Sequence, residues 1–157
     1  VLVEPVLPTG VTVHEAPDLA FVDHDAVAHM LRVSQTNPEA QVGFVMTLDG
    51  FATMLYDGEQ PVCVLARVDG VPAGITFGGV TAQTLSIAYS GVDPTFRGRG
   101  VMRAVKAQAH LVAAGLGAIV ARTNNEEHNA GIRRINADLG YLAEFGVYRM
   151  VQELPLA

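Results

Sequence analysis

The sequence of 157 residues has no tryptophan, a single cysteine and no cluster of residues that predicts a metal site. It also lacks an apolar run near the ~20 residues of a membrane-spanning helix, and its start lacks the basic, then apolar, pattern of a secretory signal. These absences predict a cytoplasmic protein without a membrane partner. Cys63 cannot form a disulfide within the chain, and its apolar neighbours Val62 and Val64 favour a buried thiol over a nucleophile.

Composition predicts one globular domain preceded by a short arm. Half of the residues are apolar, which gives a chain of this length enough material for a single core. Residues 1–10 carry Pro5 and Pro8, as is typical of a stiff linker or arm. We therefore expect residues 11–157 to form the domain, and the sequence leaves a homo-oligomer open.

The charge is acidic overall and unevenly distributed. The formal charge of −6 disfavours a nucleic-acid partner, because a phosphate backbone requires a basic face. Residues 1–93 carry a net charge of −9 and residues 94–157 a net charge of +3. This division suits an anionic cofactor on the C-terminal half and a neutral or cationic acceptor facing the N-terminal half. Solubilising surface charge explains the acidic half equally well.

Apolar periodicity predicts an α/β (α+β) fold in which a mixed, mostly antiparallel sheet is flanked by helices. Asp69-Gly70 is a strong hairpin signal, and Gly74, Gly78 and Gly79 are expected to weaken or bulge the strand that follows it. His24 and His29 lie on a predicted helix, and we interpret both as solvated or structural. The predicted strands are 11–15, 62–68, 71–81, 84–92 and 118–121; the predicted helices are 19–37, 51–56, 101–115 and 124–139; one or two closing strands are expected within 141–154.

A sequence typical of a phosphate-binding loop follows the predicted strand 84–92: residues 92–102 are VDPTFRGRGVM. Glycine at a helix start costs about 1 kcal/mol relative to alanine, so Gly98 and Gly100 suggest that something approaches the backbone closely. The free N–H groups of the first helical turn would then face an anion. Neither a P-loop lysine nor the third glycine of a dinucleotide-binding fingerprint follows.

This strand, proline and Arg-Gly-Arg-Gly order resembles motif A of the GCN5-related N-acetyltransferase (GNAT) family. The resemblance implies that the loop amides hold the pyrophosphate of acetyl-coenzyme A (acetyl-CoA), bound where two strands splay apart. It also implies that an N–H near Val92, where the family bulges its central strand, faces the oxyanion, and that residues near 39–58 shape the acceptor pocket. The family motif ends in glycine or alanine, whereas this chain has methionine there. The cofactor residues implied in this stretch are Gly91, Val92, Arg97, Gly98, Arg99, Gly100, Val101 and Met102.

Residues 123–141 resemble the second cofactor segment of the family, which places Asn129 at the family asparagine. Asn124 and Asn129 are both cofactor candidates, and helix capping is the alternative for each, fitting Asn124 well. Asn136 stands where many relatives have a tyrosine that protonates the departing sulfur. Tyr89 and Tyr141 are candidates to replace that tyrosine, with core packing as the alternative for either.

The resemblance implies an acetyl-CoA-dependent N-acetyltransferase in which an amine of a small molecule or peptide attacks the thioester directly. Tyr89 and Asn136 are then the candidate catalytic residues. The alternative function is a non-catalytic acyl-CoA-binding domain, for instance one half of a tandem acetyltransferase. A third interpretation is an unrelated α/β domain whose loop binds nothing.

Overall fold

A computed structural model describes residues 2, 4–16, 22–33, 45–56 and 60–144. The strands are β1 (Val11–Ala16), β2 (Gln60–Val68), β3 (Val71–Thr81), β4 (Thr84–Val92) and β5 (Val120–Thr123). The helices are α1 (His24–Val33), α2 (Leu48–Tyr56), α3 (Val101–Gly115) and α4 (Ala130–Asp138), with a 3-10 turn, η4, at Pro94–Phe96.

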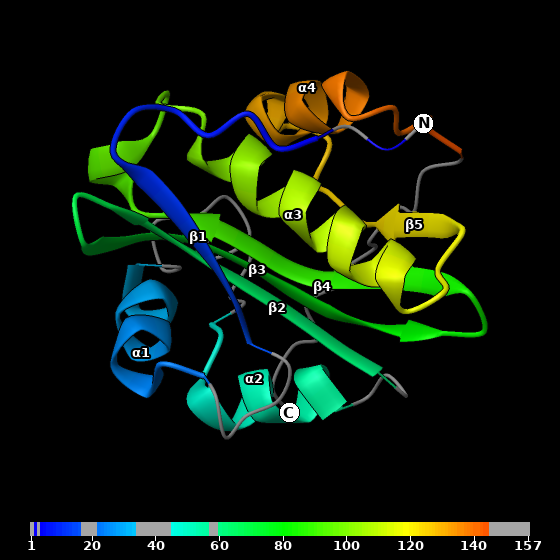
Figure 1. Cartoon of the computed structure of the whole chain (residues 1–157), viewed down its shortest axis with the longest axis horizontal. Helices are drawn as coiled ribbons and strands as arrows, with labels where there is room; N and C mark the ends of the chain where they lie inside the picture. Colours follow the sequence, from blue (N-terminus) through cyan, green and yellow to red (C-terminus); the bar gives the residue numbers. More distant parts are fainter. Residues whose placement is uncertain (1, 3, 17–21, 34–44, 57–59, 145–157) are drawn as a thin grey trace, which may run out of the picture.

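The five strands form one sheet in the order β1-β2-β3-β4-β5. The first four strands pair antiparallel, and β5 pairs parallel to β4, so the predicted mixed sheet is confirmed. The Asp69-Gly70 turn joins β2 to β3 as expected, with both residues at positive φ. In Figure 1, α3 and α4 lie on one side of the sheet and α1 and α2 on the other.

Both faces of the sheet are buried, which explains the nearly continuous apolar runs in β2 and β3. Alternate residues of β2 serve the two layers: Val62 and Val64 pack toward α3, whereas Cys63 and Leu65 pack with α1 and α2. Cys63 is therefore the buried thiol that the sequence predicted, and burial raises its pKa to about 12.

Strand β4 contains a β-bulge, which lies next to the candidate functional site. Phe77 pairs with Tyr89 and the next residue, Gly78, pairs with Ile87, so Ala88 has no partner on β3. A Cβ on Gly78 would lie 2.0 Å from the backbone oxygen of Ser86, so this position requires glycine. The resemblance had placed the bulge near Val92; that position is wrong, because the register from Tyr89 to Val92 is regular.

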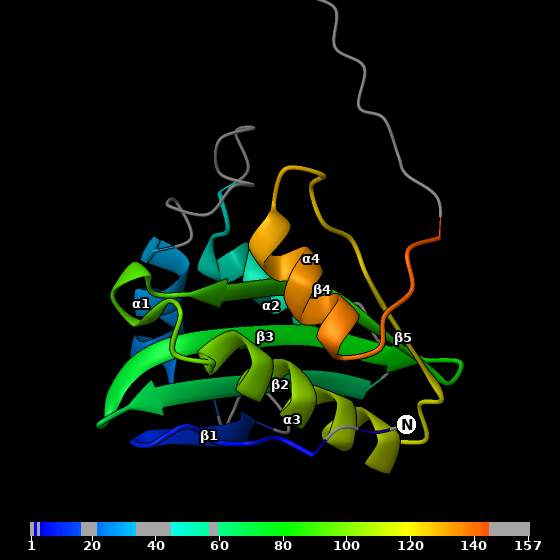
Figure 2. The ribbon, with the colours of Figure 1, turned by 90° about the horizontal axis from the view of Figure 1, so that it is seen from above.

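The pairing between β4 and β5 ends just before this bulge. Their pairing runs from Thr84–Val120 to Ile87–Thr123 and then stops. Figure 2 shows β4 continuing past the end of β5, with α4 beside α3 along this stretch. Beyond Ile87, β4 is therefore no longer paired with β5.

Several predicted boundaries differ from the observed ones. β5 begins at Val120 rather than residue 118, and Ile119, expected to be buried, is 77% exposed. α2 begins at Leu48, earlier than expected. α1 begins at His24, because the Ala26 N–H donates to Asp23 Oδ1 at 3.0 Å and caps the helix there. Residues 19–21, 34–37 and 145–154 of the predicted elements lie outside the described residues, and no strand is found within 141–144.

Polar contacts attach helix α4 to α3. Lys106, which is the only lysine of the sequence, is completely buried on α3. Its Nζ donates to Oδ1 of Asn136 on α4 at 2.8 Å and lies 5.4 Å from the centre of the Tyr141 ring. Burial lowers the pKa of Lys106 to about 8, because a charged amine is disfavoured away from water.

A second hydrogen bond fastens the chain after α4 to the same face of α3. His110 Nε2 lies 2.7 Å from the hydroxyl oxygen of Tyr141. Burial, and secondarily the charge of Lys106, lowers the pKa of His110 to about 4, while burial raises that of Tyr141 to about 12. The imidazole is therefore neutral in the folded protein near pH 7.

None of the helices in the described part of the chain is long and apolar enough to cross a bilayer.

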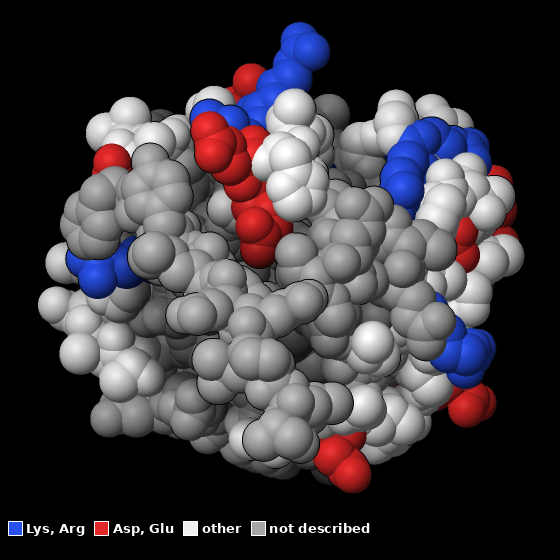
Figure 3. Space-filling view, turned by 180° about the vertical axis from the view of Figure 1, so that it is seen from behind, with Lys and Arg blue, Asp and Glu red and all other residues white. Residues whose placement is uncertain are grey.

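Figure 3 shows the face opposite to that of Figure 1, where a group of acidic side chains lies next to basic ones. The described side chains of that face form no broad basic surface.

Acidification should destabilise the fold through His110. The unfolded imidazole takes up a proton below its ordinary pKa of 6.5, whereas the folded one stays neutral to about 4, so the unfolded state binds more protons between these values. The free energy of unfolding should fall by about 1–2 kcal/mol from His110 alone between pH 7 and about pH 5. Urea denaturation of the parent and of His110→Gln at both pH values measures this difference.

The His110→Gln variant should lose that part of the pH dependence, whatever its stability at pH 7. His128→Gln, which changes an exposed histidine before α4, is the matched control and should retain it. Equal pH dependence in the parent and His110→Gln would show that His110 is not the responsible group.

Candidate functional site

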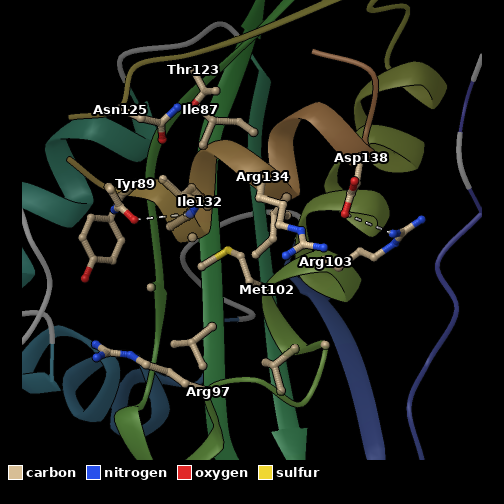
Figure 4. A pocket seen from close by; sticks show the side chains of 18 of the residues that line it. Ile87, Tyr89, Arg97, Met102, Arg103, Thr123, Asn125, Ile132, Arg134 and Asp138 are labelled. Atoms are coloured by element: carbon tan, nitrogen blue, oxygen red, sulfur yellow. Dashed lines mark hydrogen bonds and ion pairs between the residues drawn. The ribbon is translucent and has the colours of Figure 1, made fainter. Parts of the chain in front are cut away.

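A pocket of about 720 Å³ occupies the space where β4 separates from β5. Its walls come from the open part of β4, the loop and first turn of α3, the segment after β5, and α4. Figure 4 shows Tyr89 on one side of this pocket and Arg103 and Arg134 on the other. The lining residues are Ile87, Ala88, Tyr89, Ser90, Gly91, Val92, Phe96, Arg97, Gly98, Gly100, Val101, Met102, Arg103, Thr123, Asn124, Asn125, Asn129, Gly131, Ile132, Arg134, Ile135 and Asp138.

The first turn of α3 opens into the pocket without a side-chain cap. Gly100 is the N-cap residue and has no side chain to offer. Within the described chain, the backbone N–H groups of Val101, Met102 and Arg103 have no hydrogen-bond acceptor. Unpaired N–H groups and the positive end of the helix dipole together favour a bound anion.

Both loop glycines have a left-handed backbone, with φ of 74° at Gly98 and 77° at Gly100. This conformation, rather than the approach of a ligand alone, requires glycine at both positions. A Cβ on Gly98 would meet nothing within 4 Å, but one on Gly100 would lie 2.9 Å from Cγ of Pro8. The close neighbour at Gly100 is thus the N-terminal arm, which runs past α3 before it enters β1 in Figure 1.

Asp93 holds the turn that precedes this loop. Its carboxylate accepts from the Thr95 N–H at 2.9 Å and from His29 Nε2 of α1 at 2.9 Å. Burial by itself raises the pKa of Asp93, but these hydrogen bonds outweigh it and leave the pKa below its ordinary value. His29 has the structural role expected of it, as the contact that joins α1 to the loop.

Nine of the ten predicted cofactor residues line this one pocket. The exception is Arg99, which is absent from the lining and instead lies 5.8 Å from the centre of the Phe96 ring. Tyr89, predicted as a catalytic candidate, lines the same pocket and packs against Phe77, with ring centres 5.5 Å apart.

Asn129, not Asn124, caps helix α4. Its Oδ1 accepts from the Ile132 N–H at 3.3 Å, and α4 begins at Ala130. The predicted start near residue 124 is wrong, because residues 124–129 form a loop after β5. Both asparagines still line the pocket, and Asn129 combines this position with its capping role.

Asn136 and Tyr141 lie away from the pocket. The amide oxygen of Asn136 is occupied by Lys106, and the Tyr141 hydroxyl by His110. Asn136, predicted as a catalytic candidate, therefore does not face the pocket, because it turns toward α3. Of the tyrosines proposed to act on the departing sulfur, Tyr89 is the one placed at the pocket.

The α4 residues that line the pocket were not among the predicted site residues. Ile132 and Ile135 supply apolar surface, and Arg134 and Asp138 supply charge. The spacing of Ile132, Ile135 and Asp138 could have indicated this wall, because residues three apart lie on one side of a helix. The late start of α4 concealed which side faces the pocket.

No family model and no curated protein matches this sequence. Solved structures do match. AAC(6')-Iy in complex with the bisubstrate analog CoA-S-monomethyl-acetylneamine is 16% identical with a TM-score of 0.63, covering 92% of this chain and 99% of that one. A ribosomal-protein-alanine N-acetyltransferase from Brucella melitensis is 17% identical with a TM-score of 0.65, covering 91% and 99%.

A GCN5-related N-acetyltransferase from Kribbella flavida is also similar, with 22% identity and a TM-score of 0.64. The match covers 90% of this chain and 49% of that one, so this chain spans about half of its length. The chain therefore has the GNAT fold, and the fold expected from the two motifs is confirmed.

Alanine at either loop glycine should destabilise the fold, because a left-handed backbone costs an L-residue about 1–2 kcal/mol. Gly100→Ala should cost more than Gly98→Ala, since its Cβ also meets Pro8. Urea denaturation of both variants, each with and without Pro8→Ala, checks this expectation. Pro8→Ala should reduce the cost at Gly100 and leave the cost at Gly98 unchanged; an equal effect on both would refute the contact.

Proposed function

We propose that this protein is an acetyl-CoA-dependent N-acetyltransferase. The observation that carries the proposal is that two features open into one pocket: the uncapped first turn of α3 and the stretch of β4 beyond its pairing with β5. Acetyl-CoA has a matching form, with a pyrophosphate at one end and a long polar arm that ends in the thioester. The similar structure of AAC(6')-Iy with a CoA bisubstrate analog supports this assignment.

The chain offers a separate group for each part of this cosubstrate. The N–H groups of residues 101–103, with Arg97 nearby, would hold the pyrophosphate. The backbone of β4 after Ile87, beyond its pairing with β5, would bond to the amides of the arm, as a neighbouring strand would. The thioester would then lie toward Tyr89, because this residue lines the pocket beside the bulge.

The proposed reaction is direct attack by an amine. A C–N bond forms between the neutral amine and the thioester carbonyl carbon, the C–S bond breaks, the amine loses a proton and CoA leaves as a thiol. We propose that the Tyr89 hydroxyl supplies a proton to the departing sulfur and regains one from solvent. The acceptor is an amine of a small molecule or peptide, in line with similar structures named for an aminoglycoside and for a ribosomal protein.

Acetyl-CoA should stabilise the fold by mass action, by about 2.7 kcal/mol at a hundredfold excess over its dissociation constant. Desulfo-CoA should do the same, since the pyrophosphate supplies much of the binding, whereas pantetheine, which has no pyrophosphate, should stabilise less. Thermal unfolding with each ligand measures these shifts. If neither nucleotide ligand raises the melting temperature at millimolar concentration, the proposed cofactor site is wrong.

Single-turnover reactions with a panel of amines separate catalysis from mere binding. An acetyltransferase should release free thiol in step with amide formation when a suitable amine is present. A domain that only binds acyl-CoA should be stabilised by acetyl-CoA yet release no thiol with any amine of the panel.

Tyr89→Phe should lower the acetylation rate about a hundredfold, the usual worth of a positioned proton donor, while acetyl-CoA affinity changes little. Tyr141→Phe is the matched control, because this tyrosine lies away from the pocket and bonds to His110. Its rate should equal that of the parent even though its stability falls. A Tyr89→Phe variant of unchanged rate would remove Tyr89 from the reaction.

A further inference from the structure

The wall between α3 and α4 carries positive charge away from the uncapped N–H groups. Arg103 on α3 and Arg134 on α4 both line the pocket, and Figure 4 shows them on the same side of it, with Arg103 extending toward Asp138. Arg103 Nη1 lies 3.8 Å from Oδ2 of Asp138, and both side chains are about half exposed. Arg134 has no hydrogen bond or ion pair with any residue that the structure describes.

The neighbouring arginine shows that this placement is specific to Arg134. Arg133 points elsewhere, donating to the backbone oxygen of Glu127 at 3.0 Å, and does not line the pocket. Two guanidinium groups and one carboxylate therefore face the space between the helices and leave one positive charge unmatched there. A guanidinium fork suits a phosphate group, which accepts two parallel hydrogen bonds.

We propose that Arg134, together with Arg103, binds the 3′-phosphate of coenzyme A, so that the pocket selects CoA over 3′-dephospho-CoA. The proposal rests on the proposed function, since it concerns the same cosubstrate. CoA carries two separate anionic groups, a pyrophosphate and a ribose 3′-phosphate. The structure has two separate positive features for them: the first turn of α3 and the Arg103–Arg134 wall. Asp138 holds Arg103 at this wall through their ion pair.

Calorimetric titration with CoA and with 3′-dephospho-CoA at one fixed ionic strength tests the proposal. The parent should bind CoA at least about tenfold more tightly, the usual worth of a charge-assisted hydrogen bond. Arg134→Gln should weaken CoA binding about tenfold and leave 3′-dephospho-CoA binding nearly unchanged, so that the preference disappears. Arg133→Gln removes the same charge one residue earlier on the exposed side of α4, and it should keep the preference of the parent.

Equal affinity of the parent for the two ligands would overturn the 3′-phosphate subsite while leaving the cofactor site intact. An equal loss of preference in Arg133→Gln and Arg134→Gln would also overturn it, because general attraction to a basic helix would then explain the selectivity. Failure of the parent to bind either ligand would instead refute the proposed function itself.

Discussion

The separation of β4 from β5 after Ile87 is the constraint on which the candidate site depends. Parallel pairing holds the two strands together for four residues, and the bulge at Ala88 then turns β4 away from the line of its neighbour. A strand that loses its neighbour inside a protein needs a ligand, water or another segment to pair with its backbone N–H and C=O groups. The uncapped first turn of α3 and Tyr89 both line the pocket beside this stretch of β4.

The opposite wall of the pocket depends on a polar attachment. In α4 only Asn136 is buried, and its partner is the fully buried Lys106. Removing a lysine from water is unfavourable, as the lowered pKa of Lys106 reflects, and the hydrogen bond to Asn136 offsets part of that cost. Such a directional contact fixes how α4 sits on α3. It thereby determines that Ile132, Arg134 and Ile135 face the pocket.

The loop between β4 and α3 is held from three sides. His29 of α1 bonds to Asp93, Asp93 caps the turn η4, and Pro8 of the N-terminal arm lies against Gly100. These contacts join segments far apart in the sequence to one short loop. The N-terminal segment, predicted as a stiff linker or arm, is thus part of the support of the candidate site.

The sequence alone determined the sheet, its hairpin, helix α3 and the glycine loop of the pocket, because local patterns encode them: alternation, a turn dipeptide, and glycines at a helix start. Only the tertiary structure decided the roles of Asn129, Asn136 and Tyr141. Each of these residues has a polar side chain that can cap a helix, bind a ligand or satisfy a buried partner. Spacing along the chain does not distinguish these roles, because the packing of α4 against α3 determines which partner each side chain meets. Buried Lys106 and His110 need hydrogen-bond partners there, and Asn136 and Tyr141 supply them.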